Sequence, residues 1–259
     1  MKMLEPVWRT KTETASRLRG RVEAVLDWAT ARKFRSGENP ARWKGHLDKL
    51  LPARTKIRSV EHHAALPYDE IGPFMAQLRE QQGFAARGLE FAILTAARTG
   101  EVIYATWDEL NLPAAVWTVP GHRMKAGKEH RVPLSRRAAA ILETMQNLRQ
   151  SDFVFPGARP KKPLSNMAFL QLLKRIERRD LTAHGFRSTF RDLAAESTAY
   201  PSEVVEMALA HSISNKIEAA YRRGDLFEKR RRLMEDWAMH CATNSRRTDN
   251  IVSIKGTST

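Results

Sequence analysis

The most informative segment of the chain is residues 184–221, which read HGFRSTFRDLAAESTAYPSEVVEMALAHSISNKIEAAY. Apolar residues recur at helical spacing within 187–196 and again within 202–209. The segment therefore predicts two consecutive helices, with polar and aromatic residues of chemical interest at their ends.

Those residues are two histidines, an arginine and a tyrosine. His184 and Arg187 are three positions apart, so one helical turn would place them on the same face. His211 follows the second predicted helix, and Tyr221 comes ten residues later. Together they could supply a nucleophile, positive charge and proton-transfer groups, which are needed to cleave a phosphodiester without a metal.

A second arginine precedes this segment. Arg98 ends the helix predicted over 85–97, within the sequence TAARTGE at residues 95–101. Glu101 follows three residues later and is close enough along the chain to support its guanidinium. Arginine pairs suit phosphate because their planar donors match the geometry of its oxygens.

Over the whole chain, the spacing of apolar residues predicts a mainly α fold with a small antiparallel β-sheet, in the α+β class. Strands are expected over 116–120 and 130–134, joined by a basic hairpin tip with Lys-Ala-Gly-Lys at 125–128. The other helices are expected over 14–31, 42–51, 68–82, 135–149, 166–178 and 216–237, the last interrupted near Gly224.

Composition bounds the possible partners. The 259 residues include 44 Lys and Arg against 29 Asp and Glu, a net charge of +15. This excess indicates a polyanionic partner, above all nucleic acid, although a solvated basic face is the alternative. Cys241 is the single cysteine, which excludes an intrachain disulfide framework and a cysteine-based zinc finger. The absence of a signal-peptide pattern or a long apolar run predicts a cytoplasmic, nucleoid-associated protein with no membrane partner.

Taken in order, the motifs resemble those of the tyrosine recombinase, or phage integrase, family in its temperate-phage and genomic-island branch. The resemblance runs from about residue 14 to 240 and rests on these residues: Arg98, Lys125, His184-Gly185-Phe186-Arg187, Leu209-Ala210-His211 and Tyr221. It implies a catalytic domain over 59–242, preceded by a partial helical core-binding domain and linker over 1–58. Residues 243–259 are expected to be a disordered polar tail, and the chain to be truncated at its N-terminus relative to the family.

The resemblance also implies a mechanism. Tyr221 would attack the scissile phosphate and stay linked to the 3′-phosphate, which frees a 5′-hydroxyl. Lys125 would protonate the leaving 5′-oxygen, and His184 would serve in proton transfer. A second strand's 5′-hydroxyl would then attack the phosphotyrosine and reseal the DNA.

Other residues receive supporting roles from the same resemblance. Arg98 and Arg187 would hold the non-bridging oxygens, His211 would donate a hydrogen bond to the phosphate, and Glu101 would stand behind Arg98. No metal or cofactor is implied. The residues expected to contact DNA elsewhere are Arg123, Lys128, Arg222 and Arg223.

The implied partners are double-stranded DNA attachment sites and accessory DNA-bending or directionality proteins. The resemblance also implies a homotetramer on DNA, and the chain could be a monomer in the absence of DNA. The implied function is integration or excision of a mobile element. Several alternatives stay open. Lys128 could replace Lys125, and both His184 and His211 could be structural. The whole protein could be a catalytically silent or truncated DNA-binding remnant, or could relax DNA like a type IB topoisomerase.

Overall fold

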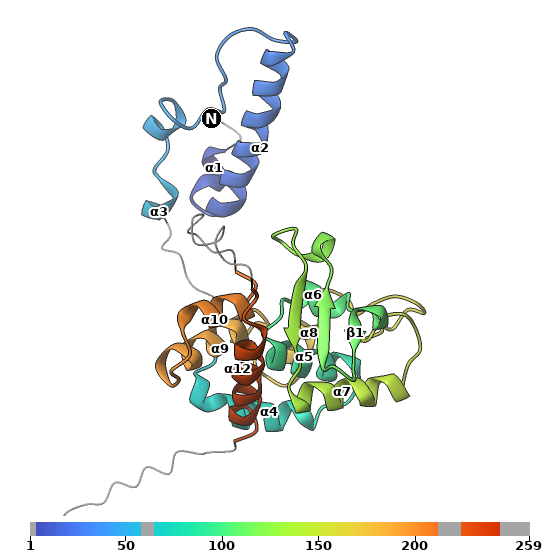
Figure 1. Cartoon of the computed structure of the whole chain (residues 1–259). Helices are drawn as coiled ribbons and strands as arrows, with labels where there is room; N and C mark the ends of the chain where they lie inside the picture. The colour runs from blue at the N-terminus through green and yellow to red at the C-terminus, as the bar shows by residue number, and fades with distance from the viewer. Residues whose placement is uncertain (1–3, 58–64, 212–223, 244–259) are drawn as a thin grey trace, which may run out of the picture. The chain divides into compact units, whose positions relative to one another are not determined.

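The computed structural model describes residues 4–57, 65–211 and 224–243 (Figure 1). The chain divides into two compact units, Met1–His62 and His63–Thr259. Within the described residues, no helix combines the length and the apolar character that crossing a membrane requires.

The first unit is small and helical. Its elements are α1 (Glu5–Trp8), α2 (Thr12–Ala31), a 3₁₀ turn η1 (Leu47–Lys49) and α3 (Arg54–Ile57). The rings of Trp8 and Trp43 stack with centroids 5.3 Å apart, and the Trp8 indole donates to the Pro52 carbonyl at 3.0 Å. These contacts fold the segment after α2 back onto α1.

The structure confirms the helix predicted over 14–31 but corrects the one predicted over 42–51. There the described chain has turns and only the short η1, because Gly45 adopts a φ of +79° that an α-helix cannot accommodate. The periodic apolar residues of α2 also remain largely uncovered, since Val25 is 63% exposed and Trp28 is 56% exposed.

The second unit confirms the predicted fold class, mainly helical with a small antiparallel sheet. Unpredicted features include the short helix α6 (Thr99–Ile103) and the short strand β1 (Leu110–Asn111). The helix predicted over 68–82 is split into η2 (Tyr68–Glu70) and α4 (Ile71–Arg79). The elements of the second unit are η2 (Tyr68–Glu70), α4 (Ile71–Arg79), α5 (Phe84–Thr95), α6 (Thr99–Ile103), η3 (Trp107–Glu109), β1 (Leu110–Asn111), β2 (Val116–Val119), η4 (Gly121–Arg123), β3 (His130–Pro133), α7 (Arg136–Asn147), α8 (Ala168–Arg175), α9 (Gly185–Glu196), α10 (Ser202–Ala208) and α12 (Phe227–His240).

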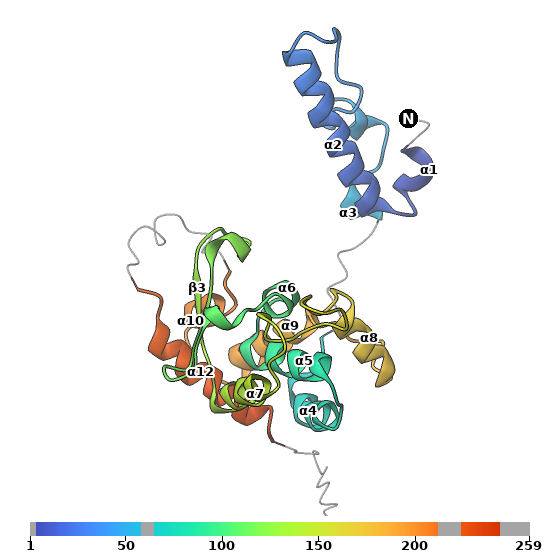
Figure 2. The same ribbon diagram turned by 90° about the vertical axis from the view of Figure 1, so that its right-hand side faces the viewer.

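The three strands form one antiparallel sheet in the order β1-β2-β3. Thr118 pairs with Arg131 and Val116 with Pro133, which fixes the register of the β2–β3 hairpin. The hairpin projects from the helical body (Figures 1 and 2). A Cβ added to Gly121 would lie 2.8 Å from the Gly127 carbonyl oxygen, so glycine allows the neck of the hairpin to close.

The core of this unit surrounds α5, and α12 packs against that core. Trp237 of α12 is completely buried, packs edge-on against Phe190 of α9, and donates to the Ile93 carbonyl of α5 at 2.8 Å. The predicted helix through Trp237 is thus confirmed from Phe227 onward, whereas its part over 216–223 lies outside the described residues.

A buried carboxylate also belongs to α5. The Glu90 side chain is fully buried and forms ion pairs with Arg79, Arg87 and Arg137 at 2.8–2.9 Å. Burial of a charge is costly unless it is paired, so these three guanidiniums make the position tolerable. The ion pairs tie α4, α5 and α7 together.

Candidate active site

Arg98 is held by the start of a helix. Helix α5 ends at Thr95, and Ala96 turns the chain with a left-handed φ of 48°. Arg98 then forms the N-cap of α6, where Glu101 closes a capping box. One Glu101 oxygen accepts from the Arg98 backbone N–H at 2.8 Å and the other from Nη1 at 2.7 Å. Both the backbone and the guanidinium of Arg98 are therefore fixed by one carboxylate.

Arg187 lies in the first turn of α9 and is only 5% exposed. Its Nη1 donates to the Ala96 carbonyl, and its Nη2 donates to the Leu209 carbonyl at 2.6 Å. Burial, and next the nearby Arg98 guanidinium, lower the pKa of Arg187 to about 10. The two guanidiniums are thus held close enough for each to disfavour the charge of the other.

The end of α10 joins these two arginines. The backbone N–H of His211 donates to the Glu206 carbonyl, and that of Ala210 donates to the Met207 carbonyl. With Ala210 at a φ of 49°, this is a Schellman motif. The carbonyls at this helix end that have no partner within the helix carry the negative end of the helix dipole. Arg98 Nη2 lies 3.2 Å from the Ala210 oxygen, and the Leu209 oxygen accepts from both guanidiniums.

The same motif places the His211 ring between Glu206 and Arg187. His211 Nδ1 lies 2.5 Å from a Glu206 carboxylate oxygen, and its Nε2 lies 3.3 Å from Arg187 Nη2. The other Glu206 oxygen accepts from Arg191 Nε at 2.8 Å. Partial burial raises the pKa of Glu206, but the hydrogen bonds from His211 and Arg191 outweigh it and lower the pKa below its ordinary value.

A third imidazole lies beside this cluster. His130, the first residue of β3, interacts with the backbone of Ala208 and with the charges of Arg98, Glu101 and Arg230. Burial, and next the Arg230 cation, lower the pKa of His130 to about 4. At neutral pH His130 is consequently uncharged, so it adds no further repulsion to the two arginines.

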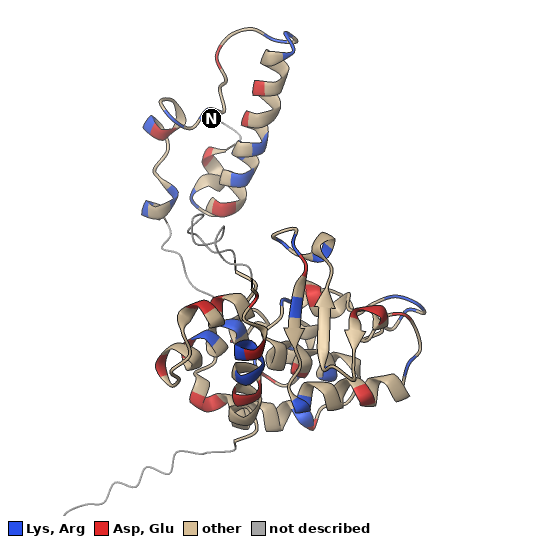
Figure 3. Ribbon diagram, viewed as in Figure 1, with Lys and Arg blue, Asp and Glu red and all other residues tan. Residues whose placement is uncertain are grey.

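The hairpin carries the predicted lysines. Lys125 and Lys128 are exposed between η4 and β3, and basic residues mark the tip of the hairpin (Figure 3). Arg123, a further residue expected to contact DNA, directs its guanidinium to the Glu109 carboxylate and the Glu101 carbonyl within the chain. His184 is the exposed N-cap residue of α9, and its carbonyl accepts from the Arg187 backbone N–H at 3.1 Å.

The expected nucleophile, Tyr221, lies outside the described residues, as do Arg222 and Arg223. One described tyrosine is poorly suited to replace it. The Tyr200 hydroxyl donates to an Asp236 carboxylate at 2.6 Å. Burial, followed by that hydrogen bond, raises the pKa of Tyr200 to about 12, which disfavours the phenolate.

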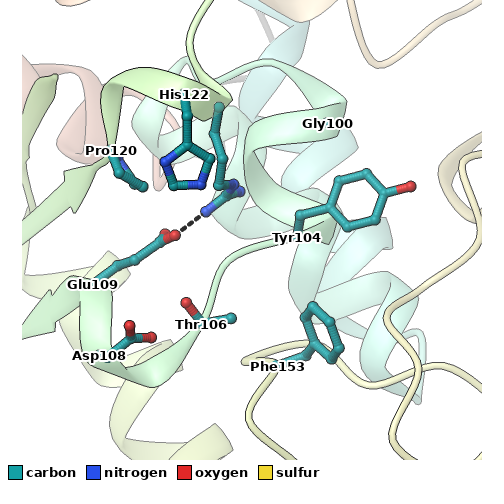
Figure 4. A pocket seen from close by; sticks show the side chains of 9 residues that line it. Gly100, Tyr104, Thr106, Asp108, Glu109, Pro120, His122 and Phe153 are labelled. Carbon is teal, nitrogen blue, oxygen red and sulfur yellow. Dashed lines mark hydrogen bonds and ion pairs between the residues drawn. The ribbon is translucent and has the colours of Figure 1, made fainter. Parts of the chain in front are cut away.

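A separate pocket contains Tyr104, but its chemistry is less suitable for phosphate. Asp108 and Glu109 line it, and the Arg123 guanidinium is paired with Glu109 (Figure 4). The Tyr104 hydroxyl points away from this ion pair (Figure 4). The Arg123 guanidinium is already paired with Glu109, and Asp108 adds a negative charge, which disfavours a phosphodiester here. We therefore assign the candidate active site to the arginine cluster.

Within the described part of the chain, no group of three His, Cys, Asp or Glu side chains could hold a metal ion.

Among the residues expected at the site, the structure brings together Arg98, Glu101, Arg187 and His211. It adds Glu206 and His130, which the sequence reasoning missed. Glu206 lies five residues before His211, a spacing that a regular helix does not place on one face.

Comparisons with known proteins identify relatives of the chain and of its fold. The model of the phage integrase family matches residues 66–226, and that of the phage integrase central domain matches residues 1–46. Prophage integrase IntZ of Escherichia coli (strain K12) is 34% identical over 239 residues, covering 91% of this chain and 57% of that protein. The integrase of Enterobacteria phage P4 is 27% identical, covering 95% and 59% respectively. The chain thus spans somewhat more than half the length of these relatives.

Solved structures show the same fold. A lambda integrase(75–356) dimer bound to a COC′ core site has a TM-score of 0.60 at 17% identity, covering 86% of this chain and 78% of that chain. The Tn1549 transposon integrase in complex with circular intermediate DNA has a TM-score of 0.61 at 14% identity, covering 90% and 83%.

Proposed function

Because this chain belongs to the phage integrase family, we propose that it is the catalytic part of a site-specific DNA recombinase. It would cleave and rejoin DNA through a 3′-phosphotyrosine intermediate, and so integrate or excise a mobile element.

The observation that carries the proposal is the convergence of three cationic or polar side chains on one turn. Arg98 binds the Ala210 carbonyl from 112 residues away in sequence, and Arg187 binds Leu209 next to His211. Holding two guanidiniums side by side is unfavourable unless an anion uses them, so perturbed arginines of this kind are typical of functional sites. A guanidinium has five donors, which lets Arg98 bind the protein and a phosphate oxygen together.

In the proposed reaction, the Tyr221 oxygen forms a bond to phosphorus while the bond from phosphorus to the 5′-oxygen breaks. The tyrosine proton passes to a base, for which His184 is the candidate, and Lys125 gives a proton to the leaving 5′-oxygen. Arg98, Arg187 and His211 would stabilise the negative charge of the transition state. Religation is the reverse reaction with a different 5′-hydroxyl. The phosphotyrosine ester retains the energy of the broken phosphodiester bond, so no nucleotide cofactor is needed.

We further propose double-stranded DNA attachment sites as substrates and a homotetramer as the assembly on DNA. A related solved structure is a lambda integrase tetramer bound to a Holliday junction, at 17% identity and a TM-score of 0.60. The net charge of +15 favours a DNA partner. The candidates for contacts to the DNA backbone are Arg123, Lys128, Arg222 and Arg223.

A library of nicked duplexes with randomised sequence around the nick would test the proposal. After cleavage near the nick, the short fragment carrying the 5′-hydroxyl diffuses away, so the covalent adduct accumulates. The wild-type chain should form an adduct that survives denaturation, whereas Tyr221→Phe should still bind DNA but form none. An adduct of undiminished yield with Tyr221→Phe would refute Tyr221 as the nucleophile. Binding without any wild-type adduct would favour a catalytically silent remnant.

A further inference from the structure

We propose that Glu206 is a positioning residue for DNA cleavage: it holds the Nδ1–H of His211 and thereby turns Nε2 toward the phosphate site beside Arg187. This inference rests on the proposed function and deepens it, since it assigns a role to a carboxylate outside the expected set.

Two bonds connect the same pair of residues. The His211 backbone N–H donates to the Glu206 carbonyl at 3.0 Å, and the ring Nδ1 meets the Glu206 carboxylate at 2.5 Å. The first bond is the six-residue closure of the Schellman motif at the end of α10. It fixes the backbone so that the ring has its carboxylate partner within reach, five residues back.

The ring has two distinct nitrogens, and the partner of one determines the role of the other. A carboxylate accepts hydrogen bonds, so it requires the proton on Nδ1. In a neutral ring, Nε2 then accepts from Arg187 Nη2, 3.3 Å away. In a ring that carries a proton on both nitrogens, Nε2–H would donate to a phosphate oxygen bound beside Arg187.

Glu206 is itself held in place. Its second carboxylate oxygen accepts from Arg191 Nε at 2.8 Å, one turn further along α9 than Arg187. Arg191 and Arg187 thus connect α9 to the end of α10 at two points. The two bonds to Glu206 also lower its pKa, which keeps the carboxylate ionised at neutral pH.

Single-turnover cleavage of nicked duplex DNA by full-length variants would measure the effect. Glu206→Ala removes the acceptor and should slow adduct formation by about ten-fold to a hundred-fold, as loss of an orienting partner commonly does. Glu206→Gln keeps a carbonyl acceptor and should recover part of the rate. The control Glu196→Gln removes an exposed carboxylate at the end of α9 and should leave the rate unchanged.

Nitrogen NMR of the imidazoles gives a readout that a merely structural role would not change. With the His211 signals assigned from a His211→Gln variant, the wild-type chain should carry the proton of its neutral ring on Nδ1. The Glu206→Ala variant should shift toward the Nε2–H form, while Arg191→Ala should keep the wild-type form.

The outcomes separate the two proposals. A wild-type chain without adduct would overturn the proposed function, and the tautomer comparison would still decide whether Glu206 controls the ring. A normal wild-type adduct combined with an unchanged rate in Glu206→Ala would overturn the positioning role alone. The same tautomer in wild type and Glu206→Ala would overturn it as well.

Discussion

Acidification should destabilise the second unit, His63–Thr259, through His130 at the start of β3. Its imidazole is largely buried beside Arg98 and Arg230, and its pKa is lowered from 6.5 to about 4, mainly by burial and next by Arg230. As the pH falls, the unfolded chain takes up a proton near 6.5, whereas the folded chain resists until about 4. The stability from this group is therefore present above pH 6.5 and is lost progressively between 6.5 and 4.

The size of the effect follows from the pKa difference. At about 1.4 kcal/mol per pKa unit, the full loss amounts to about 3 kcal/mol. Between pH 7 and pH 5 the contribution is about 2 kcal/mol, because the unfolded-state titration is then mostly complete. This is a substantial fraction of the stability of an ordinary domain, roughly 5–15 kcal/mol.

Urea denaturation at pH 7 and pH 5 would measure this loss of unfolding free energy. Wild type should lose about 2 kcal/mol more between these pH values than His130→Gln, which has no group titrating there. The control His122→Gln replaces an exposed imidazole on the same hairpin and should follow wild type. Equal pH dependence in wild type and His130→Gln would show that His130 is not held uncharged.

Three other predictions concern the cluster and the core. Glu101→Gln weakens the support of Arg98 and should reduce the single-turnover cleavage rate by at least about ten-fold, since charge-assisted bonds contribute roughly 1.5–3 kcal/mol. A bridging 5′-phosphorothiolate should rescue Lys125→Ala, because a thiolate leaves without an acid; rescue of Lys128→Ala instead would move the role of acid to Lys128. Glu90→Ala leaves three arginines without their buried partner and should cost about 3 kcal/mol in urea denaturation, and a loss near zero would contradict the ion-pair account.

The sequence predicted what depends on residue type and local spacing. The helix before Arg98 and the two that carry Arg187 and lead to His211 follow from apolar periodicity, and the β2–β3 hairpin follows from its short strands, whereas the five-residue α6 after Arg98 was not predicted. The pairing of Glu101 with Arg98 was also predictable, because a spacing of three places the carboxylate over the first turn of α6.

The remaining features depend on long-range packing or on turn geometry. His130 is a plain strand residue in the sequence, and its burial arises only when β3 meets α10 and α12. Glu206 reaches His211 because a left-handed Ala210 closes the helix end, and alanine gives no signal of that conformation. The helix expected over 42–51 failed because the positive φ of Gly45 outweighed the apolar pattern.

Peptide mapping of the covalent complex tests the nucleophile directly, since it identifies the side chain that carries the DNA. After nuclease and protease digestion of the adduct, mass spectrometry should find a nucleotide 3′-phosphate on the peptide containing Tyr221, one of four tyrosines in the chain. The same remnant on the Tyr104 or Tyr200 peptide would contradict the account, because those phenols lie in the acidic pocket and on Asp236 respectively.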